Sequence, residues 1–344
     1  MPRNLNTSAK SQYTREACEK WKELPTLTLA RLIYERRPQY FPNLQAARHA
    51  VRYVRGNNGA KARRIATANH KSLFRPPGKA GFVWTPPESI AKEWTSFILD
   101  TPKNLIISDL HIPFHDPAAL EVAVARGVKW QPDCLLINGD FGDFYSISRF
   151  DKDPTVSHLR DEIDAMRQGL GWLRQKFPKA RIVYKLGNHD EWWEAYLCRK
   201  APELVGLNCT KLENILTEDI GDGTGEIGGI EFVKDQRRIM LGKLPVLHGH
   251  ELGKGFAPPV NPARGAFLKA IDHILVGHHH QYSTHQSKTI MGKIIVTFST
   301  GCLCQMNPKF ARVNQWAHGF AEVEVSKGHA FEVRNWRIVN GKIY

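Results

Sequence analysis

Five segments of the sequence carry side chains that bind metal ions, and each one follows a run of apolar residues. In chain order they are Asp109-x-His111, Gly139-Asp140-x-x-Asp143, Gly187-Asn188-His189-Asp190, His248-Gly249-His250 and Gly277-His278-His279-His280. Carboxylate and imidazole ligands together suit Mn, Fe or Zn better than Mg or Ca, which prefer shells of oxygen alone. A single Asp-x-His or Gly-Asp is common in any chain, but the ordered set of five predicts a metal centre.

The spacing inside two of these segments suits a shared ion. In an extended backbone, residues i and i+2 project to the same side, so Asp109 and His111 can face one ion. The same reasoning applies to His278 and His280, and it predicts that His279 between them points away from the ions.

Glycine precedes the ligand in three of the segments, at Gly139, Gly187 and Gly277. Without a Cβ atom, glycine lets the backbone turn sharply and places the next side chain at the tip of the turn. In a two-metal hydrolase one carboxylate usually bridges both ions, and Asp140 is the candidate for that bridge.

Short apolar runs that alternate with longer helical ones must position these segments. The expected strands cover residues 105–107, 134–137, 182–186, 245–247, 274–276 and 294–298, with helices at 118–130 and 158–177 between them. Residues 231–241, 321–325 and 330–338 have a purely β pattern. This order predicts a layered α/β domain in which the polar segments meet at the carboxyl ends of strands.

The order of the five segments resembles the calcineurin-like metallophosphoesterase superfamily over roughly residues 103–320. Every block of the family signature is present, including His189, which is missing from some members known for binding rather than catalysis. The run 139–154 and the basic N-terminal region are also similar to phosphoesterases encoded by bacteriophages and prophages. The resemblance implies a layered metallophosphoesterase β-sandwich flanked by helices, to which this chain adds a small N-terminal helical domain.

The resemblance also implies two divalent metal ions, with Mn²⁺ expected first and Fe, Zn or Ni as alternatives. One ion would be held by Asp109, His111, Asp140 and His280. The other would be held by Asp140, Asn188, His248 and His278. Choosing His248 rather than His250 follows the first-histidine pattern of the family.

Family logic implies hydrolysis of a phosphoester. Two cations that share a water lower its pKa from 15.7 toward about 7, which makes hydroxide available at neutral pH. His189 would protonate the leaving oxygen as general acid, and Asp143 would accept a hydrogen bond from His189 that holds its tautomer. Phe144 stands where protein Ser/Thr phosphatases of the family usually have arginine, which counts against that activity.

Four other residues near these segments have no settled role in the sequence. Trp192 and Trp193 directly follow Gly-Asn-His-Asp and could stack on a base at the mouth of the site. The competing interpretation, which we favour, packs at least one of them in the core. The roles of His250 and His318 stay open.

Positive charge is concentrated at the N-terminal end of the chain. Residues 1–100 hold 18 Lys and Arg against 7 Asp and Glu, a net charge of +11 out of +14 for the whole chain. This asymmetry predicts a polyanionic partner, nucleic acid before membrane. We expect a basic helical module at 1–75 that loosely resembles a helix-turn-helix, a linker at 76–100, and the metallophosphoesterase domain at 101–344.

Two helices are expected in the basic module. The first covers 26–37 and stops at Pro38, and the second starts after Asn43, a suitable N-cap, and runs to Arg55. The candidate nucleic-acid contacts are Arg48, Arg52, Arg55, Lys61, Arg63 and Arg64. The competing interpretation is a small helical cap whose charged face is only solvated.

The composition is that of an ordinary soluble globular protein, with 42% hydrophobic and 24% charged residues in 344. The sequence contains no apolar stretch of membrane-spanning length and no signal-peptide core. We therefore expect a cytoplasmic protein of a bacterium or of a phage-infected host cell. The six cysteines show no disulfide spacing, and we expect them to be reduced. Oligomeric state is not predicted.

Together these features predict a two-metal-dependent phosphoester hydrolase, a phosphodiesterase or nuclease that acts on DNA or RNA. The alternative is a phosphatase or phosphodiesterase for small phosphoesters or cyclic nucleotides, in which the basic module serves assembly. A third hypothesis, a non-catalytic binding scaffold, is disfavoured by the complete ligand set and by His189. The sequence does not decide between monoester and diester substrates, because the same two-metal centre serves both.

Overall fold

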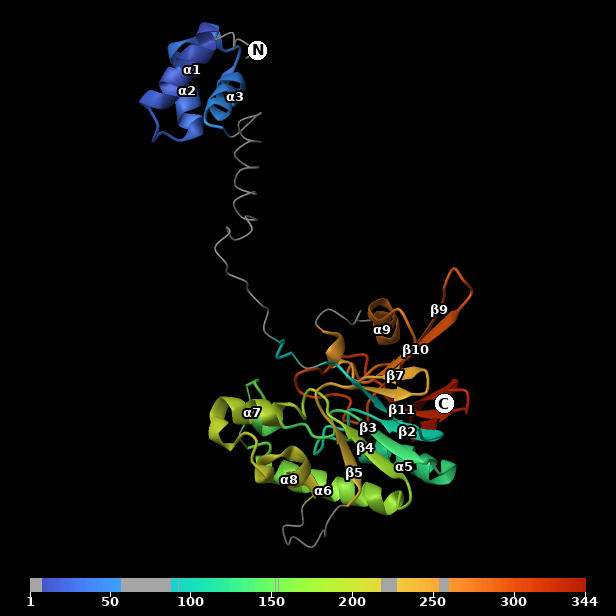
Figure 1. The fold of residues 1–344 in the computed structure, drawn as a ribbon. Coiled ribbons are helices and arrows are strands. Elements are labelled where there is room, and N and C mark those ends of the chain that lie inside the picture. Colours follow the sequence, from blue (N-terminus) through green and yellow to red (C-terminus); the bar gives the residue numbers. More distant parts are fainter. Residues whose placement is uncertain are drawn as a thin grey trace. The chain divides into compact units, whose positions relative to one another are not determined.

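The computed structural model describes residues 8–56, 88–91, 93–151, 153, 155–217, 228–253 and 260–344. They separate into two compact units, Met1–Ala91 and Lys92–Tyr344, each with its own hydrophobic core (Figure 1). Three of the candidate nucleic-acid contacts, Lys61, Arg63 and Arg64, lie outside the described residues, as do residues 76–87 of the expected linker.

The described part of the first unit is helical. It comprises α1 (Ala9–Lys20), α2 (Thr26–Arg36), a 3₁₀ turn η1 (Pro38–Tyr40) and α3 (Leu44–Val54). Apolar side chains from all three α-helices, among them Ala17, Ile33 and Val51, form the core of this unit. Asn43 caps α3 by accepting a hydrogen bond from the amide of Ala46 at 2.9 Å, which confirms the predicted start of that helix.

Arg55 is engaged inside this unit. Its guanidinium donates to Thr26 Oγ1 at 3.2 Å and to the carbonyl oxygens of Trp21 at 3.2 Å and Lys22 at 3.3 Å. The side chain therefore ties the end of α3 to the segment that joins α1 to α2. This use counts against the expected contact of Arg55 with nucleic acid, whereas Arg48 and Arg52 lie half-buried on α3.

The second unit contains two β-sheets. The first has the strand order β13-β12-β11-β2-β3-β4-β5 and the second has the order β1-β6-β7-β8-β10-β9. The bounds are β1 Ser96–Ile98, β2 Lys103–Ile107, β3 Cys134–Asn138, β4 Arg181–Lys185, β5 Ile230–Val233, β6 Arg238–Leu241, β7 Leu244–Val246, β8 Ile274–Val276, β9 Tyr282–Lys288, β10 Ile294–Thr300, β11 His318–Val325, β12 Phe331–Val339 and β13 Lys342–Ile343. In the first sheet β2, β3, β4 and β5 run parallel, so their carboxyl ends meet at one edge.

Alternation along the parallel strands divides the core into two layers. In β2, Leu105 and Ile107 face one cluster of buried side chains, and Ile106 between them faces the other. The first cluster lies under α5 (Pro117–Trp130) and α6 (Leu159–Lys176), and the second lies between the two sheets (Figure 1). The expected layered β-sandwich flanked by helices is therefore confirmed.

Further helices complete the second unit. They are α7 Trp192–Lys200, α8 Leu212–Thr217 and α9 Pro262–Ala270, with 3₁₀ turns η2 Tyr145–Ile147, η3 Pro202–Leu204, η4 Asn208–Thr210 and η5 His250–Leu252. Ala266 of α9 packs with Ile274 and Val276 of β8, which places this helix against the second sheet. No helix of the described residues is both long and apolar enough to span a membrane.

One boundary predicted from the sequence is wrong. Ser96–Ile98, inside the expected linker 76–100, forms β1 and pairs with β6, because Phe97 packs against the core between the sheets. Residues 231–241, which have a purely β pattern in the sequence, cover most of β5 and all of β6, and these two strands belong to different sheets. Asp235 and Gln236 between them have φ of 58° and 51°, and this turn separates the two strands.

A buried ion pair joins the first sheet to the loop after β7. Lys185, the last residue of β4, places Nζ 2.7 Å from a carboxylate oxygen of Glu251, and both side chains are almost fully buried. The carboxylate of Glu251 also accepts hydrogen bonds from the amides of His248 and Gly249. Burial opposes the ionisation of Glu251, but the Lys185 ammonium opposite it lowers the pKa of this carboxyl to about 2.

We expect Lys185→Met to lower the free energy of unfolding by about 3–5 kcal/mol, because it leaves the Glu251 charge buried without its partner. Urea unfolding followed by circular dichroism measures the loss. The matched control is Lys293→Met, since Lys293 pairs with Asp272 at 2.8 Å but both side chains are more than half exposed. That control should cost less than about 1 kcal/mol, and an equal loss in both variants would contradict the role given to burial.

Candidate metal centre

The five polar segments meet at one edge of the second unit. Asp109, Asp140 and Asn188 follow the neighbouring parallel strands β2, β3 and β4, and His248 and His278 follow β7 and β8, which also run parallel. Backbone hydrogen bonds join the loops, since the amide of Asp109 donates to the carbonyl of Gly139. The convergence expected from the strand pattern is therefore present.

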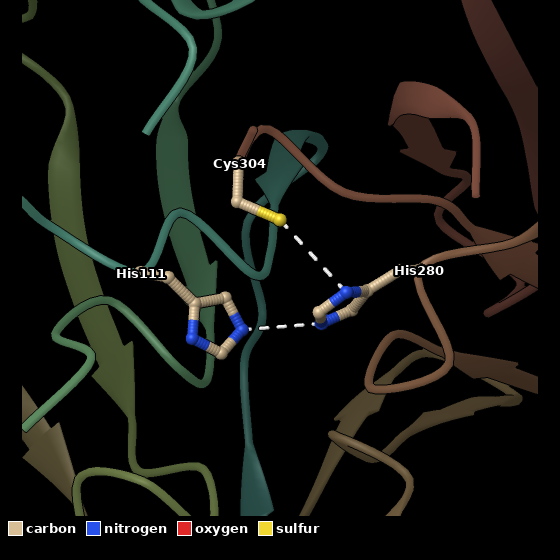
Figure 2. A group of neighbouring side chains, drawn as sticks. All are labelled: His111, His280 and Cys304. Carbon is tan, nitrogen blue, oxygen red and sulfur yellow. Dashed lines mark hydrogen bonds between the residues drawn. The ribbon is translucent and has the colours of Figure 1, made fainter. Parts of the chain in front are cut away.

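One group of donor atoms surrounds the first expected ion position. His111 Nε2 and His280 Nε2 face each other at 3.1 Å, as Figure 2 shows. His280 Nε2 also lies 3.3 Å from Asp109 Oδ1, and His111 Nε2 lies 3.8 Å from Asp140 Oδ2. Metal–ligand bonds of about 2.0–2.2 Å place neighbouring ligand atoms about 3 Å apart, so these separations fit four ligands of one ion.

A second group lies on the other side of Asp140. His248 Nε2 is 3.2 Å from Asp140 Oδ2, and the donor atoms of Asp140, His248 and His278 converge within 4.8 Å of one another. Asn188 Oδ1 and His248 Nε2 are buried, and neither atom makes a hydrogen bond within the described part of the chain. Buried polar atoms are normally satisfied, so two such atoms beside a carboxylate fit the ligand shell of a divalent cation.

The backbone is left-handed at five of the seven expected metal ligands. The φ angles are Asp109 56°, His111 52°, Asp140 49°, His278 67° and His280 57°. The expectation that an extended backbone aligns these side chains is therefore wrong, and His278 and His280, which the spacing places on one ion, belong to different groups of donor atoms. Each non-glycine residue in this region costs about 1–2 kcal/mol, and such strain persists where the surrounding structure fixes it.

Two of the three glycines act by close approach rather than by turning. Gly139 has a φ of 87° and makes the predicted turn. A Cβ on Gly187 would lie 2.2 Å from Asp140 Oδ1 and 2.4 Å from the amide nitrogen of Asp140. At Gly277 it would lie 2.1 Å from Ser108 Oγ. These glycines are needed because neighbouring loops press against them.

The electrostatics of the centre favour positive charge. Asp109 and Asp140 are buried, which opposes ionisation, yet His248 and the other imidazoles opposite them hold the pKa values of both carboxyls below the usual range. Burial likewise opposes the charged form of His248, but Asp140 and Asp109 raise its pKa to about 10. Burial and the charge of His248 lower the pKa of His278 to about 3. Two buried carboxylates thus attract any cation that fits between them.

Asp190, the last residue of Gly-Asn-His-Asp, connects neighbouring loops through hydrogen bonds. Its carboxylate accepts hydrogen bonds from the amides of Asp140 at 2.9 Å, Gly187 at 2.8 Å and Gly142 at 3.3 Å. The hydroxyl of Tyr184 donates to it at 2.6 Å. Its role could not be predicted from the sequence, because most of its hydrogen-bond partners come from distant segments.

Asp143 and His189 interact differently from the prediction. His189 Nδ1 bonds to the backbone carbonyl of Asp143 at 2.7 Å, while the carboxylate oxygen lies 3.6 Å away. That carboxylate instead contacts His111 Nδ1 at 2.9 Å. Asp143 therefore contacts one expected metal ligand, His111, with its side chain and the expected acid, His189, with its backbone. The amide of His189 donates to Asp140 Oδ1, which fixes the acid beside the centre.

Two neighbouring histidines belong to none of the groups of donor atoms that could hold an ion among the described residues. His250 Nε2 lies 3.3 Å from Glu191 and Nδ1 lies 3.5 Å from Glu251. His248 belongs to the group of donor atoms around Asp140, and His250 does not. His279 packs its ring on His278 at 4.9 Å, and burial lowers its pKa to about 4.

Side chains that the sequence analysis left without a role surround the histidines. Trp192 stacks on His189 with ring centroids 4.0 Å apart, and it also packs against the core. Trp193 packs there too and donates to the carbonyl of Thr210. His318 Nε2 lies 2.8 Å from the carbonyl oxygen of Cys304.

Cys304 and Trp316 had no predicted role at the site, because their contacts with His280 join distant segments of the chain. Cys304 Sγ lies 3.8 Å from His280 Nδ1, so that Nε2 is the nitrogen that faces His111 (Figure 2). Trp316 packs edge-on against the same ring at 4.2 Å. Both residues limit the rotation of one ligand.

Comparison with known proteins gives weak similarities, and no family model matches the sequence. The chain is 27% identical over 239 residues to the Gene 54 protein of Mycobacterium phage L5. The matched region covers 65% of this chain and 89% of the relative. The Gene 54 protein of a second phage, Mycobacterium phage D29, is 29% identical over 245 residues, with the same shares covered.

Solved structures with some similarity include zinc-bound Vps29 from Entamoeba histolytica (13% identity, 70% of this chain and 96% of that chain, TM-score 0.35). The phosphoesterase YfcE from E. coli (14%, 68% and 98%, 0.32) and the nuclease MPE from Pseudomonas putida (14%, 70% and 85%, 0.30) follow. These TM-scores are too low for residue roles to be transferred, so the candidate site rests on the geometry of this chain alone.

Gly187→Ala should weaken metal binding about 10- to 100-fold, because the added Cβ forces the Asp140 loop away from its place. Titration of the metal-free protein with Mn²⁺, followed by calorimetry, measures the change. Gly328→Ala is the control, since its Cβ would meet nothing within 4 Å. Unchanged Mn²⁺ affinity in the Gly187 variant would contradict the position given to Asp140.

Proposed function

We propose that this chain is a two-metal-dependent phosphoester hydrolase, a phosphodiesterase or nuclease that acts on DNA or RNA. The observation that carries the proposal is the convergence of two donor groups on Asp140, with His189 beside them. Mn²⁺ is the first candidate ion, and Fe, Zn and Ni are alternatives, because the donor set mixes imidazole with carboxylate.

The ligands would be those predicted from the sequence. Asp109, His111, Asp140 and His280 would hold one ion, and Asp140, Asn188, His248 and His278 would hold the other. When bound, such a pair of cations neutralises phosphate oxygens and lowers the pKa of a shared water toward about 7.

His189 supplies the proton for the leaving oxygen. Its Nδ1 is held by the carbonyl of Asp143, so Nε2 is the atom from which a proton can leave. Burial lowers the pKa of His189, which makes the imidazolium a stronger acid. Trp192 stacked on the ring and the hydrogen bond from its amide to Asp140 fix the orientation of His189. Expulsion of the alkoxide is thereby coupled to protonation at one atom.

The basic N-terminal module would bring the enzyme to its polymer. The support for this is the net charge of +11 in residues 1–100 against +3 in the remainder. Arg48 and Arg52 on α3 are the described candidates for phosphate contacts, and Lys61, Arg63 and Arg64 follow in the sequence.

His189→Ala should keep its metal and lose most turnover, about 100- to 10,000-fold, on substrates with alkoxide leaving groups. Asp140→Ala should lose both metal ions and activity, because both donor groups include that carboxylate. Metal per chain is measured by atomic emission, and turnover with a single-stranded oligonucleotide in Mn²⁺. Cleavage by the His189 variant at the wild-type rate would refute the acid assignment.

Binding of the full chain to DNA should fall steeply with salt if phosphate contacts supply the affinity. Arg48→Ala/Arg52→Ala should weaken binding and reduce the slope of log K against log salt by up to about 0.7 per lost contact on a single strand. Fluorescence anisotropy at several salt concentrations measures both. A slope that does not differ from wild type would remove these arginines from the interface.

A further inference from the structure

Aromatic rings extend from the metal centre on the side of His189. Trp192 lies on His189, and Phe150 lies 6.1 Å from Trp192 between ring centroids. Phe150 is 59% exposed, and the guanidinium of Arg149 lies 5.2 Å above its ring. An exposed aromatic ring beside a cation is a suitable surface for the face of a nucleobase.

A matching arm extends on the side of His280. Trp316 packs on His280 at 4.2 Å, and Phe310 lies 6.2 Å from Trp316. Phe310 is 84% exposed. The segment 305–317 that carries this arm contains Lys309 and Arg312 and no acidic residue. An exposed phenylalanine and two cations in one segment fit a ligand that is both aromatic and anionic.

His111 joins the two arms through the centre itself. Its ring lies 4.6 Å from that of His189 and 4.9 Å from that of His280. The rings therefore form one continuous row, with the metal ligands in the middle and an exposed phenylalanine at each end. A phosphate held at the middle would have an aromatic surface on both of its ester sides.

We propose that this row binds an unpaired polynucleotide, with a base stacked on Phe150 and Trp192 and another on Phe310 and Trp316, on either side of the scissile phosphate. The inference rests on the proposed function and specifies its substrate as single-stranded DNA or RNA. A small monoester occupies only one side of the phosphate and leaves one arm unused. A duplex keeps its base faces stacked inside the helix, away from the rings.

The test compares kcat/KM of the full-length, Mn²⁺-loaded protein on a single-stranded oligonucleotide, the same strand with abasic sites flanking the cleaved phosphate, and the matching duplex. Each lost stacking contact should lower kcat/KM about 5- to 100-fold. Phe310→Ala and Phe150→Ala should each show this loss on the normal strand and almost none on the abasic strand. Phe310→Trp should retain activity, whereas Phe310→Leu, which keeps the apolar area without the ring, should not.

Ile290→Ala is the matched control, since it removes a fully exposed apolar side chain from the turn between β9 and β10. As a second readout, a 2-aminopurine base placed beside the cleaved phosphate should be quenched on binding to metal-free protein, and less so in the phenylalanine variants. Equal losses on normal and abasic strands, or equal cleavage of duplex, would overturn the stacking inference while leaving the hydrolase intact. A wild-type protein that cleaves none of the three substrates would overturn the proposed function itself.

Discussion

The carboxylate of Asp140 is the constraint on which the rest of this site depends. It is buried, and both groups of metal-ligand atoms include it. A buried carboxylate is stable only when positive charge lies close to it. Here that charge comes from neighbouring imidazoles, His248 above all, which lower the pKa of Asp140. The same carboxylate accepts the amide of His189, so the group that would bind both cations also positions the expected acid. Under the proposed function, the charge of the centre, the binding of both ions and the position of the acid would all depend on this one side chain.

The surrounding loops keep Asp140 in its left-handed backbone conformation. Parallel strands bring three loops to one edge, Gly187 lets one loop touch the Asp140 backbone, and Asp190 accepts the Asp140 amide. Glu251, paired with Lys185 in the interior, fixes the amides at His248. A buried network in which every hydrogen bond is made is rigid. The position of each loop therefore depends on the positions of the others. The left-handed ligands persist because no loop can relax alone.

Much of this arrangement could be predicted from the sequence, and the limits have a physical pattern. Alternating strands and helices gave the layered fold, and the ligand types with their order gave the seven expected metal ligands. Side-chain contacts between distant segments could not be predicted from the sequence. Nothing local indicates that the Asp143 carboxylate reaches His111, that Arg55 closes its own module, or that Cys304 and Trp316 hold His280. The alignment of Asp109 with His111 was expected for a wrong reason, because local spacing does not reveal left-handed backbone.

The central claim is that two cations share the Asp140 carboxylate. Electron paramagnetic resonance of the full-length protein with two equivalents of Mn²⁺ tests it directly, since ions bridged by one carboxylate are magnetically coupled. The account predicts a spin-coupled spectrum that replaces the signal of isolated Mn²⁺ as the second equivalent is added. A spectrum that stays that of isolated, uncoupled Mn²⁺ while both equivalents bind would contradict it.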